Sequence, residues 1–296
     1  MFVFKVKKGI NQAIKISEKS VIEATKRGEP FYQTVNGKKR HYAYCPVCEN
    51  PVILINVHVD NQYIDEAEKT LSMHARHIKS DVSGVGKYSQ DAYDSCPYAN
   101  PSSSKSKVRR PKGTVSNELL WLIKTFPDAI DTVMRRDVGI LASETLFEKM
   151  LTNFKEEDGH LYRYVSKPNL PYSFMYMADS QDILFEKTDI NYSSGRELKK
   201  LINENATWCF VSKYGTICKK KNAEKYVRLT IHFTDFEIHE LDSEKYQKFS
   251  FIITESYGGQ KTEILKKEVK FDQFYYLNII EKRMRYINLA KNILGY

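Results

Sequence analysis

The hydrophobic pattern of the first hundred residues predicts short strands and helices joined by tight turns. Residues 11–28 have apolar spacing that favours a helix, and a glycine and a proline follow its last turn. Asn36-Gly37 lies between stretches of aromatic and β-branched residues, which is typical of a two-residue β-hairpin turn. The apolar run at 51–59 predicts another strand. Residues 65–79, with acids first and cations last, predict a second helix.

The pattern changes at residue 100. Residues 100–115 combine proline, serine, glycine and basic residues without apolar periodicity, which indicates a linker. Helical stretches follow, and Ser116 is the expected N-cap of the first. The last 130 residues or so carry strand-like segments separated by turn residues. One helix is expected among them at 194–205, and a long amphipathic helix at 272–294 closes the chain.

These patterns predict an α+β protein. It should have a small N-terminal module at residues 1–99, a basic linker at 100–115 and an α+β domain at 116–296. That last domain is expected to begin with a helical segment and to continue as a mostly antiparallel β domain closed by the long helix. A chain of 296 residues is long enough to bury a core in each of two such units.

Charge adds a candidate contact surface to this picture. The formal net charge is +9, and part of the excess is local, because residues 105–112 hold five cations and no acid. A second basic stretch at 218–228 is explained equally well by solubility. The first stretch can attract nucleic acid or an acidic protein surface. Its contact candidates are Lys105, Lys107, Arg109, Arg110 and Lys112.

Cysteines and histidines gather in one stretch of the N-terminal module. Cys45-Pro-Val-Cys48 has the spacing of a metal-binding knuckle, in which a tight turn directs two sulfurs at one ion. His74 and His77 would share one face of the predicted helix, and Cys96 precedes a proline as Cys45 does. Thiolate and imidazole ligands in this number favour structural Zn²⁺, and hence a zinc-stapled module. Five candidates compete for four positions. Cys45, Cys48, His77 and Cys96 are preferred, with His74 as the alternative to His77.

The order of these residues resembles the small zinc module at the front of CoiA-like competence proteins. The resemblance covers about residues 40–100. It implies that the metal ligands come from Cys45, Cys48, His74, His77 and Cys96. The chain departs from the family pattern in two ways: no aromatic residue stands between its histidines, and the spacing from Cys48 to His74 is longer.

CoiA-like proteins carry a nuclease-like domain behind this module, and such a domain would hold paired acids followed by a lysine. The nearest candidates are at 182–187 and 235–242. In the first, Glu186 and Lys187 would face opposite sides of a strand, and in the second the acids fill both faces. Phosphate-binding loops, nucleophile elbows and dinucleotide fingerprints are missing from the sequence. We therefore expect no enzyme. A structural role is also expected for four other titratable side chains, which are His232, His239, Cys209 and Cys218.

Two function classes remain. The Lys-, Asn-, Ile- and Tyr-rich composition resembles phage-encoded proteins of low-GC hosts, and size and layout resemble phage inhibitors of the Gabija defence nuclease. This resemblance implies a non-catalytic protein in the host cytoplasm that binds a host nucleic-acid-processing complex and blocks it sterically, with self-association as a further expectation. This resemblance assigns no role to any particular residue. The alternatives are a CoiA-like nuclease-related protein, or direct nucleic-acid binding, with the basic segment on phosphates and Tyr42, Tyr44 and Tyr98 stacking on bases.

Overall fold

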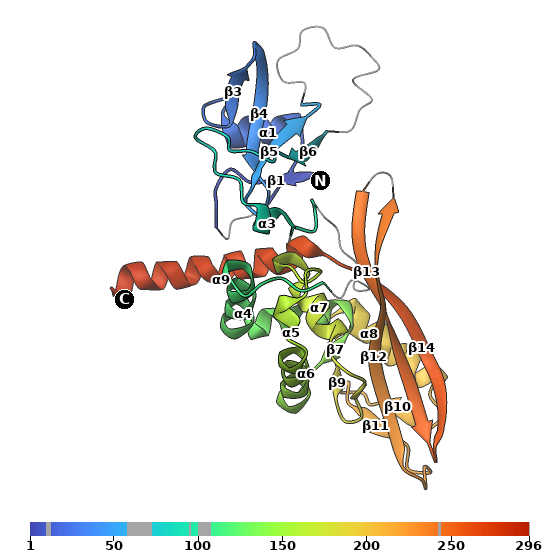
Figure 1. The fold of residues 1–296 in the computed structure, drawn as a ribbon. Coiled ribbons are helices and arrows are strands. Elements are labelled where there is room, and N and C mark those ends of the chain that lie inside the picture. The colour runs from blue at the N-terminus through green and yellow to red at the C-terminus, as the bar shows by residue number, and fades with distance from the viewer. Residues whose placement is uncertain (10–12, 58–72, 95, 100–107, 242–243, 296) are drawn as a thin grey trace. The chain divides into compact units, whose positions relative to one another are not determined.

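The structure is a computed structural model with a mixed α+β fold. The residues that it describes are 1–9, 13–57, 73–94, 96–99, 108–241 and 244–295. Within them every paired strand is antiparallel, and a long helix closes the chain (Figure 1). The predicted α+β class is therefore confirmed. The chain divides into two compact units, one of residues 1–101 with 277–296 and the other of residues 102–276.

The first unit is organised by a four-stranded antiparallel sheet with strand order β3-β4-β5-β6. Its strands are β3 (Tyr32–Val35), β4 (Lys38–Tyr44), β5 (Pro51–Ile55) and β6 (His74–His77). The predicted turn at Asn36-Gly37 joins β3 to β4, and both of its residues have the positive φ that a type I′ turn requires. The other elements of this unit before residue 100 are β1 (Val3–Phe4), β2 (Ile14–Lys15), α1 (Glu18–Thr25) and α3 (Gln90–Asp94).

Two helix predictions in this unit need correction. Helix α1 begins at Glu18 and not at residue 11, because the hydroxyls of Ser17 and Ser20 cap its first turn reciprocally. Residues 65–72 of the second predicted helix lie outside the described residues. Its last part, His74–His77, is a strand, because it pairs with β5 and buries Ala75 in the core of the unit. Tertiary pairing here overrides a helical charge pattern.

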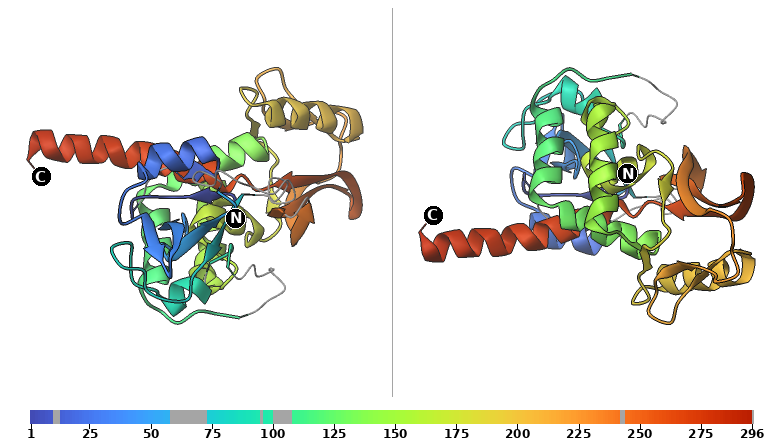
Figure 2. Two further views of the ribbon diagram at one scale, coloured as in Figure 1. Left: turned by 90° about the horizontal axis from the view of Figure 1, so that it is seen from above. Right: turned by 90° about the horizontal axis from the view of Figure 1, so that it is seen from below.

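The second unit contains a long antiparallel sheet with strand order β14-β13-β12-β8, covered by short helices. Strands β12 to β14 lie side by side in all views, as their register requires (Figures 1 and 2). The strands of the sheet are β8 (Gln181–Asp182), β12 (Val227–Leu241), β13 (Glu244–Tyr257) and β14 (Gln260–Lys270). The helices are α4 (Thr114–Thr125), α5 (Pro127–Asp137), α6 (Glu144–Glu156), α7 (Leu170–Tyr176) and α8 (Ser193–Asn205), with 3₁₀ turns at Gly159–Leu161 and Lys167–Asn169. Two small ribbons pair β7 (Ile140–Leu141) with β9 (Lys187–Thr188), and β10 (Cys209–Val211) with β11 (Ile217–Lys219).

Aromatic side chains form the core beneath this sheet. Tyr172 and Phe174 of α7 are fully buried, and the Tyr172 ring stacks on Phe271 with a centroid separation of 4.1 Å. Phe236 and Phe249 from the strands meet Phe271 edge-on. Six of the seven residues of α7 are buried, so this helix lies in the centre of the unit. Much of the chain's aromatic content is therefore core.

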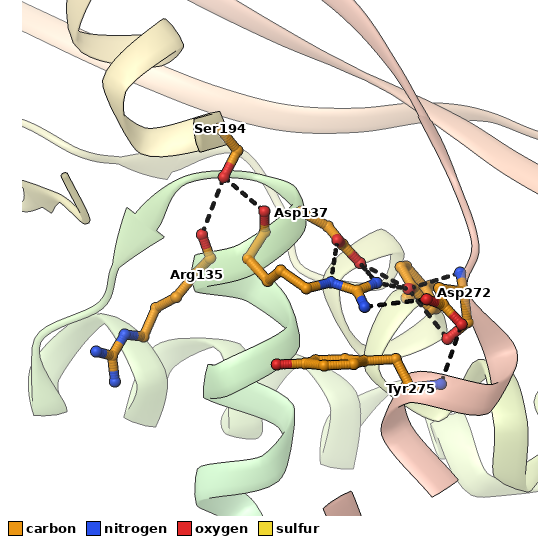
Figure 3. Close-up of polar contacts among 7 residues, drawn as sticks. Arg135, Asp137, Ser194, Asp272 and Tyr275 are labelled. Atoms are coloured by element: carbon orange, nitrogen blue, oxygen red, sulfur yellow. Dashed lines mark hydrogen bonds and ion pairs between the residues drawn. The ribbon is translucent and has the colours of Figure 1, made fainter. Parts of the chain in front are cut away.

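A partly buried group of charged side chains fixes the start of the C-terminal helix α9 (Gln273–Leu294) (Figure 3). The Arg136 guanidinium donates to Asp137 at 2.6 and 2.8 Å and to Asp272 at 3.0 Å. Tyr172 donates its hydroxyl to Asp137 and accepts the backbone N–H of Asp272. The Asp272 carboxylate also accepts the Tyr275 N–H, as an N-cap does, and the Tyr275 ring lies 3.7 Å from the Arg136 guanidinium carbon.

The electrostatics of this group favour its charged form. Partial burial opposes the charge on Arg136, but Asp137 and the other neighbouring acids outweigh burial and raise the pKa of Arg136 above its ordinary value. From α8, the Ser194 hydroxyl donates to the backbone carbonyls of Arg135 and Arg136, which ties the end of α5 to the start of α8 (Figure 3). These contacts thus join four helices that are far apart in the sequence, α5, α7, α8 and α9.

The substitution Arg136→Met should lower the free energy of unfolding of the second unit by about 3 kcal/mol, because it leaves the mostly buried Asp137 carboxylate without its cation. Urea denaturation followed by tryptophan fluorescence measures this directly, since Trp121 and Trp208 both belong to this unit. The matched control is Arg228→Met, which breaks a more exposed pair with Asp182 and should cost less than about 1 kcal/mol. Equal losses in both variants would contradict the role assigned to Arg136.

Candidate metal centre

Four of the five predicted ligands come together in the first unit. The ligand atoms of Cys45, Cys48, His77 and Cys96 all lie within 4.8 Å of one another. Cys45 Sγ is 3.7 Å from Cys96 Sγ. His77 Nε2 is 3.3 Å from Cys48 Sγ and 3.6 Å from Cys96 Sγ. Three sulfurs and one imidazole nitrogen therefore surround one point, and this group can hold a metal ion.

The local structure explains how the two cysteines of the knuckle are presented. Cys45 directly follows β4, and its backbone N–H donates to the Asn50 carbonyl at 2.9 Å. The Cys45 carbonyl in turn accepts the N–H of Glu49, a residue held at a φ of +56°. This closed turn reverses the chain between β4 and β5. It places both sulfurs on the same side of the turn, as the Cys-x-x-Cys spacing predicts.

Strand pairing decides which histidine joins the group. In β6, His77 pairs with Val52 and His74 pairs with Ile55. Residues three apart in a strand face opposite sides of the sheet, so only one of the two histidines can face the knuckle. That residue is His77, the preferred prediction. The prediction that both rings share one helix face is wrong, and His74 lies on the other face of the sheet.

A buried asparagine that the sequence analysis missed connects the two halves of the site. The Asn50 side chain, 1% exposed, donates to the Ser89 carbonyl at 2.9 Å and accepts the Ser89 N–H at 2.7 Å. This pair of bonds fixes the segment that leads through α3 to Cys96. The His77 ring also packs edge-on against Tyr93 of α3, with centroids 5.5 Å apart. An asparagine two residues past the Cys-x-x-Cys knuckle was the available sequence signal.

The ionisation of the thiols is strongly uneven. Burial opposes ionisation of Cys45, but hydrogen bonds from Cys48, Cys96 and His77 outweigh it and place the pKa of Cys45 well below its usual range. Burial, followed by the interaction with Cys45, raises the pKa of Cys96 well above its usual range. Without a cation, one ionised thiol thus opposes ionisation of the thiols beside it. A bound cation would offset this repulsion, so metal binding should release protons from the site.

The basic segment is only partly placed. Lys105 and Lys107 lie outside the described residues, and Lys112 is exposed. Arg109 forms an ion pair with Asp158 at 3.3 Å and lies over the Tyr162 ring. Arg110 is 4% exposed and donates to backbone carbonyls of residues 162–165. The backbone at 108–110 also bonds to residues 161–163, so this part of the predicted linker belongs to the second unit. Arg110 is therefore a structural residue, and its assignment as a contact for nucleic acid or an acidic partner is corrected.

The acids considered for catalysis have structural partners. Asp182 pairs with Arg228, and Glu186 accepts the backbone N–H and the hydroxyl of Ser143 at the start of α6. Asp235 pairs with Lys266 at 3.0 Å beside the irregular register between β12 and β13. Asp242 lies outside the described residues. Among the residues that the structure describes, the cysteine–histidine group is the one cluster of at least three potential ligands.

Other candidates are also structural. Burial raises the pKa of the Cys209 thiol to about 12, so this residue is unsuited to act as a nucleophile near neutral pH. His239 bonds Glu237 at 3.0 Å on the strand surface. Tyr42 and Tyr44 are buried, and the Tyr44 hydroxyl donates to the Val85 carbonyl, so neither ring is an exposed base-stacking platform.

Alanine substitutions of the two histidines should affect metal binding differently. Substituting His77 by alanine should abolish metal binding and destabilise the first unit by several kcal/mol, on the order of the binding energy that couples to folding. His74→Ala, three residues away on the opposite face of β6, is the matched control and should keep the metal. Native mass spectrometry gives the metal content, and hydrogen exchange over residues 41–55 reports the stability of the unit. Loss of metal from both variants to the same extent would refute the assignment.

Comparison with known proteins adds no relative. Neither a family model, a curated protein nor a solved structure matches the chain. In the described part of the chain, no helix combines the length and apolar character needed to cross a membrane. The resemblances to CoiA-like proteins and to phage inhibitors accordingly stay hypotheses, and the function is argued from the geometry of this chain alone.

Proposed function

We propose that the metal centre holds structural Zn²⁺. Tetrahedral zinc, bound about 2.3 Å from sulfur and about 2.0 Å from nitrogen, sets two sulfurs about 3.8 Å apart and a sulfur and a nitrogen about 3.5 Å apart. Three of the six ligand–ligand separations, at 3.7, 3.3 and 3.6 Å, are close to these values, and all six are within 4.8 Å. Three cysteines and one histidine also complete the coordination. A complete protein ligand set leaves no position for substrate and favours a structural role.

We further propose that the protein is non-catalytic and acts by binding another protein. The observation that supports this most directly is a group of exposed apolar side chains in the second unit, called here the apolar patch. Its members are Phe185, Ile190, Phe210 and Tyr214, which are 70, 41, 37 and 74% exposed. Exposed aromatic groups of this kind are typical of protein contact surfaces.

The apolar patch is held on a rigid support. The backbone N–H of Phe185 donates to Ile217 of β11, and Thr188 donates to Gly215 in the β10–β11 turn. Phe210 belongs to β10 itself, opposite Cys218 of β11. Phe185 has a φ of +74°, a costly conformation for an aromatic residue. Holding exposed apolar side chains on a strand and on turns fixed by backbone hydrogen bonds reduces the entropy lost when a partner binds.

The partner proposed is a host protein complex that acts on nucleic acid, with a Gabija-type nuclease as the best guess, and the protein itself is proposed to be phage-encoded. Blocking would be steric: the bound protein denies the complex access to its nucleic acid. This choice of partner is supported by the size and layout of the chain. The apolar patch supports only the more general statement that a protein is bound.

Purification of the tagged protein from a bacterial lysate tests this proposal. A stoichiometric partner protein should remain after nuclease treatment and at moderate salt, because an interface with an apolar centre depends weakly on ionic strength. Tyr214→Ser combined with Phe185→Ser should remove it. Tyr226→Ser is the matched control, since Tyr226 is as exposed as Tyr214 and lies outside the patch. Recovery of nucleic acid alone, lost on nuclease treatment, would overturn the proposal.

The basic segment supplies a second, independent arm of that test. Serine at Lys105, Lys107 and Lys112 removes three cations while leaving Arg109 and Arg110 in their structural contacts. The partner protein should still be recovered from this variant. If recovery instead requires these lysines and falls steeply with salt, the contact is electrostatic and the apolar patch does not carry it.

A further inference from the structure

A pocket of about 430 Å³ lies on the outer face of the four-stranded sheet of the first unit. The strand register defines this face: Tyr42, Ile53 and Arg76 are cross-strand neighbours, and Gln33 pairs with Arg40 at its edge. The opposite face packs into the core through residues such as Ala43 and Val52. The chain at 78–83, directly after β6, forms another wall of the pocket. The whole pocket is therefore built from residues 33–83, within one unit.

Two arginines line this pocket without a protein partner. Within the part of the chain that the structure describes, neither Arg40 nor Arg76 forms an ion pair, a side-chain hydrogen bond or a ring contact. Arginines elsewhere are engaged, as Arg109, Arg135 and Arg136 show. A guanidinium group offers forked donors that match the oxygens of a phosphate. Two such groups at one pocket are typical of an anion site.

The remaining lining distinguishes a nucleotide from a simple anion. The Gln33 amide nitrogen donates to the carbonyls of Pro30 and Ser83, which leaves the amide oxygen as an acceptor. Asp81 accepts the Tyr88 N–H at 2.7 Å through one carboxylate oxygen, which leaves the other to accept. Ile53 and its neighbours add an apolar floor. Inorganic phosphate or an acidic side chain would use neither the acceptors nor the floor. A nucleobase, with N–H donors and an apolar ring, would use both.

We propose that this pocket binds a nucleotide unit, with the phosphate on Arg40 and Arg76 and the base toward Gln33, Asp81 and the apolar floor. The unit can be a free nucleotide or one residue of a single-stranded nucleic acid, because both present the same groups. This activity goes beyond the proposed protein-binding function and uses a different surface on a different unit. The basic residues proposed to contact phosphate thus lie on the sheet, whereas the sequence pattern predicted them in the segment at 105–112.

The test uses the full-length, zinc-loaded protein and isothermal titration calorimetry. The probes are the four 5′-mononucleotides, a 5′-phosphorylated single-stranded DNA octamer and inorganic phosphate. Arg40→Gln with Arg76→Gln should weaken nucleotide or octamer binding at least about tenfold, because two charge-assisted contacts are lost. The matched control is Lys39→Gln with Lys79→Gln. It removes the same charge from positions one and three residues away, whose lysines lie over Tyr32 and Tyr93 and do not line the pocket. This control should change affinity less than about threefold.

Each outcome decides the question. Binding of mononucleotides that depends on the two arginines supports a free nucleotide as ligand, and arginine-dependent binding of the octamer alone supports single-stranded nucleic acid. The proposal is overturned if no nucleotide probe binds at millimolar concentration, or if both double variants weaken binding equally. It is also overturned if inorganic phosphate binds as tightly as the nucleotides, since the base would then contribute nothing. An unchanged zinc content in all variants verifies that each is folded.

Discussion

The pairing of β6 with β5 is the contact on which the first unit depends. Its register sets His77 beside Val52 on the core face and Arg76 beside Ile53 on the outer face. A shift of one residue would exchange these faces, taking the imidazole away from the cysteines and the guanidinium away from the pocket. The metal centre and the proposed nucleotide pocket are therefore two consequences of one register. Metal bound through His77 would in turn hold β6 in that register.

The second unit is stabilised differently. Its centre is a set of packed aromatic rings around α7, and its polar contacts connect elements far apart in sequence. Arg136 and Asp272 are separated by more than a hundred positions, yet they meet beside Tyr172 and fix the first turn of α9. Partly buried charges such as Arg136 cost desolvation energy and are tolerated because each finds an opposite charge or a hydrogen bond. No metal ligand group is found among the described residues of this unit.

The two proposed activities belong to different units, which are stabilised in different ways. The apolar patch lies on β10 and on turns beside β9, β10 and β11 in the second unit, whereas the arginine-lined pocket lies on the four-stranded sheet of the first. Contacts with a protein and with a nucleotide would then differ in their dependence on zinc, on salt and on individual residues. A protein that blocks a nucleic-acid-processing complex has use for both, since its partner holds nucleic acid close to the protein surface.

The sequence alone determined the features that depend on local chemistry. The α+β class, the Asn36-Gly37 turn, the helix at 194–205 and the C-terminal helix follow from periodicity and turn residues, and the Cys-x-x-Cys knuckle follows from its spacing. Only the tertiary structure decided between His74 and His77, because that choice depends on a strand whose charge pattern favours a helix. It also showed that Arg110 is buried against the segment at 162–165, and that Arg40 and Arg76 have no partner among the residues that the structure describes. For His77 and Arg110 the deciding neighbour lies far away in sequence, on a paired strand or a packed loop, where local patterns carry no information.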